Sequence, residues 1–155
     1  MDDLRDVEKI LGYNFKNYAL LEKALESAGV PCHGNNKNEG NKPLAQVGDA
    51  LIRLITLDDC FQEGKNTGQS EKICQKELSN CALQNVQQNC RLTPHIQTCP
   101  AQQGMVSRVT GATAVEALVA AVWYDSEKNY KDVHQLLHRL CIDNELLKSK
   151  THTFG

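Results

Sequence analysis

The sequence of 155 residues has few aromatic residues, which make up 5% of the chain and include a single tryptophan. Its core must therefore be built mainly from leucine, isoleucine, valine, alanine and cysteine. No run of about 18 apolar residues occurs, which excludes a membrane-spanning helix. An excess of positive charge is also missing, because the net charge is −2. This balance argues against a free-standing binder of phosphate backbones, unless a local basic face exists.

The first residues also lack the composition of a targeting segment. Residues 1–6 are acidic and contain no apolar segment, unlike a secretory signal or an arginine-rich transit peptide. If Met1 is the natural start, we expect a protein of the cytosol or nucleus. The length is that of one domain, and no repeat or linker divides it. We predict a domain over residues 1–148 and a loosely ordered tail over residues 149–155.

Seven cysteines are many for this length, but their number is odd and no C-x-x-C pair occurs, which argues against a cysteine-based zinc site. Cys74 and Cys81 are seven residues apart on one face of a predicted helix, where we expect small, buried, reduced side chains. His134 and His138 are four residues apart and could bind a metal together. The alternative for these histidines is a solvated helix face.

The hydrophobic spacing is helical almost throughout and predicts an all-α domain of about six or more helices. Apolar stripes run over residues 4–11, over residues 20–28 after Asn17 as a cap, and over residues 44–55 with Leu54 on the stripe. Further helices are predicted over residues 70–89, 107–124 and 130–147. Residues 33–41 and 93–104 are predicted loops.

Two separated segments carry a specific pattern. Residues 41–51 read N-K-P-L-A-Q-V-G-D-A-L, and residues 112–126 read A-T-A-V-E-A-L-V-A-A-V-W-Y-D-S. They resemble the two motifs of the ribonuclease III family, which usually read N-E-R-L-E-F-L-G-D-A/S and A-D-x-x-E-A-L-I-G-A-x-Y-L-D-S. Residues 7–25 and 63–90 are also similar to family patterns. The resemblance therefore covers nearly the whole chain and implies the all-α endonuclease domain of that family, and only that domain.

The resemblance implies a metal site between two helices. Positions 45 and 49 share a face of one helix, as do positions 113 and 116 of another. In a cleaving member all four are acidic and hold Mg²⁺, which prefers oxygen ligands and activates water. Here they are Ala45, Asp49, Thr113 and Glu116, and Lys42 stands at another position that is usually acidic.

Asp49 and Glu116 are therefore the candidates for catalytic residues and for ligands of a weak or vestigial Mg²⁺ site, with Thr113 holding a metal-bound water. In the alternative, they are buried acids that pair with Lys42, or with donors near Thr113, and help two helices dock. Asp125 is assigned to a helix end rather than to the site.

Two functions stay open. The first is a ribonuclease III-like domain, non-catalytic or strongly weakened, that acts as an interaction or RNA-processing module. The second is a Mg²⁺-dependent double-stranded-RNA endonuclease that works through Asp49 and Glu116. A remote third is reuse of the fold for small-molecule chemistry.

The resemblance also implies a homodimer through the helix that carries residues 41–51. Gln46 replaces the aromatic residue that usually inserts into the partner there, so other hydrophobic residues must compensate. A heterodimer with a chain that supplies an intact site stays open.

Overall fold

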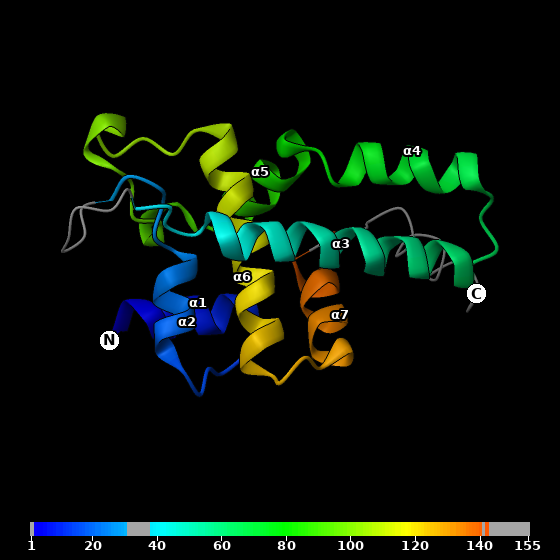
Figure 1. The fold of residues 1–155 in the computed structure, drawn as a ribbon, viewed down its shortest axis with the longest axis horizontal. Helices are drawn as coiled ribbons and strands as arrows, with labels where there is room; N and C mark the ends of the chain where they lie inside the picture. The colour runs from blue at the N-terminus through cyan, green and yellow to red at the C-terminus, as the bar shows by residue number, and fades with distance from the viewer. Residues whose placement is uncertain (1, 31–37, 141, 143–155) are drawn as a thin grey trace.

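The computed structural model describes residues 2–30, 38–140 and 142, and within these ranges the chain is all-α (Figure 1). The described helices are α1 (Asp2–Leu11), α2 (Tyr18–Ala24), α3 (Lys42–Gln62), α4 (Thr67–Glu77), α5 (Asn80–Asn89), α6 (Arg108–Asp125) and α7 (Tyr130–Arg139), with short 3-10 turns at Thr93–His95 and Pro100–Gln102. The predicted fold class is confirmed. None of these helices combines the length and the apolarity needed to cross a membrane.

Two helices form the centre of the fold. α3 runs across the molecule, α6 packs across it, and α4 lies alongside it (Figure 1). α6 is buried on nearly all sides, because the stretch from Ala112 to Val122 is mostly alanine, valine and leucine. A helix that is apolar all round is stable only inside a core. The aromatic-poor core follows the composition as predicted.

Side-chain caps set several helix starts. Asn17 accepts a hydrogen bond from the backbone N–H of Ala19 (3.1 Å), which confirms it as the cap of α2. Ser107 caps α6 by accepting from the N–H of Thr110 (3.2 Å). The predicted helix over residues 107–124 is confirmed to within one residue.

The single helix predicted over residues 70–89 is wrong, because the chain breaks between α4 and α5. Ser79 is the cause: its hydroxyl accepts from the N–H of Ala82 (3.1 Å) and starts a new helix. Serine competes for backbone groups in this way and favours caps over helix interiors. Cys74 and Cys81 therefore belong to different helices, and Cys74 is buried while Cys81 is exposed. The shared buried face predicted for them is wrong.

Two helix ends also differ from the prediction. α3 continues past residue 55 to Gln62, and its Leu54 side chain is 58% exposed rather than inward. α7 ends at Arg139 rather than at residue 147. The predicted boundary at residue 148, the tail over 149–155, Cys32, Cys141 and most of the predicted loop over 33–41 lie outside the described residues.

Asp125 closes the C-terminal end of α6 and belongs to the scaffold, as predicted. Its carboxylate accepts from the Tyr13 hydroxyl (2.8 Å) and from the N–H groups of Lys16 (3.0 Å) and Asn17 (2.8 Å). Burial raises the pKa of Asp125, but these bonds outweigh it and hold the pKa below its usual range. The bonds tie the segment before α2 to the end of the central helix.

Candidate functional site

The two helices that carry the candidate acids touch through a glycine. A Cβ atom placed on Gly48 of α3 would lie 1.7 Å from the backbone oxygen of Glu116 on α6. Only a residue without a side chain permits this approach. Asp49, the next residue, is thereby held beside Glu116.

Around this contact lies an open hollow of about 300 Å³. It is lined by the four positions that the sequence predicts to converge, which are Ala45, Asp49, Thr113 and Glu116, together with Lys42 and Gln46. The structure therefore brings the predicted residues together. Their roles as ligands or catalysts stay a prediction.

The two acids interact with each other. Burial, the charge of Asp49 and a side-chain hydrogen bond with Asp49 raise the pKa of the Glu116 carboxyl group to about 8. At neutral pH Glu116 therefore favours its protonated form.

The other lining residues do not neutralise the acids. Lys42 is exposed, and none of the ion pairs between described residues joins it to Asp49 or Glu116. The Thr113 hydroxyl donates to the carbonyl of Val109 (2.7 Å), within its own helix. Asp49 itself is exposed. The part of the alternative that makes Asp49 a buried acid is therefore wrong, and no ion pair between described residues supports its pairing with Lys42.

These donors fit one weakly held Mg²⁺ ion. Asp49 and Glu116 offer carboxylate oxygens from two helices, Thr113 keeps hydroxyl lone pairs, and Ala45 offers nothing. Mg²⁺ accepts one or two carboxylates and keeps water on its remaining positions. Binding would require Glu116 to lose its proton, which weakens affinity further near neutral pH.

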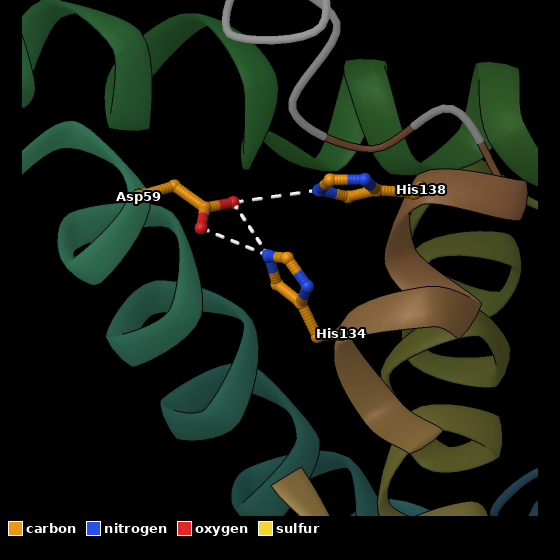
Figure 2. A group of neighbouring side chains, drawn as sticks. All are labelled: Asp59, His134 and His138. Atoms are coloured by element: carbon orange, nitrogen blue, oxygen red, sulfur yellow. Dashed lines mark hydrogen bonds and ion pairs between the residues drawn. The ribbon is translucent and has the colours of Figure 1, made fainter. Parts of the chain in front are cut away.

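A second polar cluster lies near the other end of α3, where α7 faces it (Figure 2). The Nε2 atom of His134 lies 2.9 and 3.1 Å from the two carboxylate oxygens of Asp59, and Nε2 of His138 lies 3.5 Å from one of them. Asp59 is buried and each histidine side chain is about one quarter exposed. The two histidines thus share an acid, and the solvated helix face considered for them is wrong.

Asp59 was not among the predicted site residues, although the sequence carries a signal for it. It lies four residues after Ile55 and seven after Ile52, both buried, so it continues the apolar stripe of α3. An acid on such a stripe requires a buried partner. The four-residue spacing of His134 and His138 was the sequence signal for the other two residues of the cluster.

No protein-family model matches the chain. Its curated relatives include Ribonuclease 3 of Rickettsia rickettsii (strain Sheila Smith), 25% identical over 148 residues, which are 90% of this chain and 63% of the relative. Ribonuclease 3 of Rickettsia bellii (strain OSU 85-389) is 28% identical over the same shares of the two chains. The chain therefore spans somewhat less than two thirds of the length of these relatives.

Solved structures share the fold. The nuclease domain of ribonuclease III from Campylobacter jejuni superposes with a TM-score of 0.78 at 21% identity, over 93% of this chain and 97% of that one. A second structure of that domain, described as flexible in the region involved in dimer formation, gives a TM-score of 0.76 over 87% of this chain and 93% of that one. The two motifs in order, the named relatives and the shared all-α fold together show that the chain resembles the ribonuclease III family and has the fold of its nuclease domain.

Proposed function

We propose that the chain is a ribonuclease III-like RNA-processing domain whose metal-dependent cleavage is strongly weakened. One observation carries this proposal: the carboxyl pair of Asp49 and Glu116 provides the only carboxylates among the residues that line the hollow, because Ala45 and Thr113 supply none. A Mg²⁺ ion would bind through these two carboxylates alone, and the raised pKa of Glu116 opposes it. The scaffold that would hold double-stranded RNA is retained, while the metal affinity is low.

A gain-of-function experiment tests the proposal. Carboxylates are restored by the double substitution Ala45→Glu and Thr113→Asp, and cleavage of a long end-labelled RNA duplex is measured in Mg²⁺ and in Mn²⁺. Loss of even an outer-shell partner of a metal ligand costs about 10–100-fold in affinity or activity. We therefore expect the restored variant to cleave at least tenfold faster than the natural chain.

Binding is measured separately, with the same duplex in a chelator, so that a lack of cleavage is distinguished from a lack of binding. The natural chain and the restored variant are expected to bind equally. Equal cleavage rates for the two would contradict the proposal, and so would the absence of duplex binding by the natural chain.

A second candidate is a working Mg²⁺-dependent double-stranded-RNA endonuclease that uses only Asp49 and Glu116. The raised pKa of Glu116 favours this endonuclease, because two neighbouring acids with a raised pKa are typical of a cation-binding site. In this case the natural chain yields defined duplex products, and either Asp49→Asn or Glu116→Gln abolishes them. Restoring the acids then changes the rate little.

We further propose a homodimer through α3. Leu54 and Phe61 lie seven residues apart on one side of that helix and are 58% and 79% exposed. They would supply the apolar contact that Gln46 cannot, and exposed apolar residues that repeat along a helix are typical of an interface. The Campylobacter jejuni nuclease domain, which shares the fold, has a region involved in dimer formation.

Sedimentation equilibrium tests the dimer. Leu54→Glu together with Phe61→Glu is expected to yield a monomer, while Met105→Glu is a matched control, because Met105 is 75% exposed but lies outside α3. A natural chain that is monomeric at high concentration would contradict the homodimer. It would favour the heterodimer, which is tested by mixing with a candidate partner chain.

A further inference from the structure

The cluster of Asp59, His134 and His138 is separate from the carboxyl pair. Asp59 follows Asp49 by ten residues along α3, which corresponds to about 15 Å at the rise of an α-helix. The histidines come from α7, whereas the carboxyl pair uses α6 (Figure 2). The two groups therefore share a helix and no side chain.

We propose that Asp59, His134 and His138 form a binding site for one divalent transition-metal ion of the zinc type. Each residue offers one ligand atom, and these three atoms lie within 4.8 Å of one another. Two imidazoles and a carboxylate match the preferences of zinc or ferrous iron, whereas Mg²⁺ prefers oxygen alone. The metal class thus differs from the one suited to Asp49 and Glu116.

The observed distances fit such an ion. Metal–ligand bonds of about 2.0–2.1 Å in tetrahedral geometry place neighbouring ligand atoms about 3.3 Å apart. The Nε2 atoms lie 2.9 and 3.5 Å from their nearest Asp59 oxygens, on either side of that value. Small side-chain adjustments would therefore seat the ion. On binding, the metal replaces the protons on the nitrogen atoms that face the carboxylate.

Neighbouring groups hold the ligands in place. The Tyr130 ring stacks on His134, with centroids 5.8 Å apart and planes 16° apart. The Tyr130 hydroxyl donates to the carboxylate of Asp58, so the tyrosine ties α7 to α3 beside the ligands. Such contacts fix the orientation of a ligating imidazole.

The site has one buried and one open side. Asp59 is only 6% exposed, and the histidine side chains are 27% and 25% exposed. Three protein ligands with a solvent-facing fourth position are typical of zinc sites that bind water or an exogenous ligand. Since the ligands come from α3 and α7, the ion would also clamp the end of α3 to α7.

Zinc binding to the full chain tests the proposal directly. The protein is stripped with a chelator, titrated with ZnCl₂ by calorimetry, and analysed for bound metal after dialysis; Co²⁺ serves as a spectroscopic probe of the ligand geometry. We expect one tight equivalent of Zn²⁺ per chain and a Tm that rises with metal. His134→Ala and His138→Ala should each weaken binding by at least about tenfold.

Matched controls separate this site from other metal-binding groups in the chain. His95→Ala removes a histidine that pairs with Asp3 away from the cluster, and it should bind Zn²⁺ like the natural chain. Asp49→Asn should do so as well, so the result is independent of the proposed cleavage function. Asp59→Asn, checked for folding by circular dichroism, should lose the tight equivalent.

Two results would overturn the proposal. The first is a natural chain that is folded and takes up no Zn²⁺ and shows no change in Tm. The second is tight binding that persists in both histidine variants, which would assign the metal to cysteines or to other histidines.

Discussion

The two ends of α3 place the same residue type in opposite surroundings. Asp49 faces another acid, Glu116, whereas Asp59 faces the two imidazoles of His134 and His138. Asp49 is exposed and Asp59 is buried. The acid with basic partners can thus be buried, whereas the acid with an acidic partner stays at the surface.

This difference shows how a partner decides the chemistry of an acid. Within the described part of the chain, Asp49 and Glu116 have no positively charged or hydrogen-bond-donating partner in common, and a proton or a hard cation can take that place. The Asp59 carboxylate already has hydrogen-bonding partners in two imidazoles, and a transition metal would replace the protons between them. A single helix can therefore present sites for two classes of metal.

The largest loss of stability is expected from a substitution at Gly48, where α3 and α6 touch. Gly48→Ala places a Cβ atom 1.7 Å from the Glu116 carbonyl oxygen, so α3 and α6 must move apart. We expect a loss of about 3 kcal/mol or more in the free energy of unfolding, measured by urea denaturation. Gly68→Ala is the control, because the nearest atom to its Cβ is 3.5 Å away and alanine favours a helix. Equal effects of both substitutions would mean that the glycine contact does not set the position of Asp49.

The same substitution at the two ends of α3 should give opposite results. Asp59→Asn removes charge-assisted bonds to two histidines and should lower the free energy of unfolding by about 2 kcal/mol. Asp49→Asn removes a charge that Glu116 avoids by holding a proton, and it leaves an amide beside that carboxyl group, so stability should be unchanged or slightly raised. Both are compared with the natural chain near neutral pH without divalent cations. Similar losses for the two variants would remove the contrast between the sites.

A smaller effect concerns pH. The pKa of Glu116 is raised from 4.5 to about 8, so the folded state holds a proton that the unfolded state releases. The stabilising contribution of this proton is complete below about pH 4.5 and is lost as the pH rises through about 8. Partial exposure screens the effect, which we expect to be on the order of 1–2 kcal/mol.

Glu116→Gln isolates this contribution from those of other titratable groups. The difference in stability between the natural chain and the variant should shift steadily against the natural chain between pH 5 and 8. Saturating Mg²⁺ should offset the loss at the upper end, because the ion takes the place of the proton on Glu116. A difference that does not depend on pH would contradict the raised pKa of Glu116.

Much of the site that contains Asp49 and Glu116 could be predicted from the sequence, because local spacing fixes helix faces. Positions 45 and 49, and 113 and 116, are separated by about one turn, and the structure brings all four to one hollow. The cap Asn17 acts within its own helix and was predicted from local sequence, as was a helix that starts near Ser107. What spacing cannot reveal is that Asp49 raises the pKa of Glu116 while Lys42 pairs with neither acid among the described ion pairs.

The cluster of Asp59, His134 and His138 depends on contacts between segments that are distant in the sequence. Asp59 and His134 are 75 residues apart in the chain, and nothing in the spacing of either helix brings them together. The predicted third helix stopped at residue 55, so Asp59 was not recognised as part of its buried stripe. The misplacement of Leu54 has the same origin, since an apolar residue on a helix faces inward only where a neighbouring element covers it.

The smallest change in the free energy of unfolding is expected at Thr56, which lies between Asp49 and Asp59 on α3. Thr56 is fully buried on α3, and its hydroxyl oxygen has no hydrogen-bond partner within the part of the chain that the structure describes. Thr56→Val keeps the shape and removes the unsatisfied group, so the free energy of unfolding should rise by about 1 kcal/mol.

Thr113→Val is the control, because its hydroxyl bonds to Val109 and lies nearer the surface, so a change near zero is expected. A loss of stability in Thr56→Val would reveal a partner for the hydroxyl, such as a buried water. A gain would show that the interior of α3 accepts a polar group only with a partner, a condition that Asp59 meets through its two histidines.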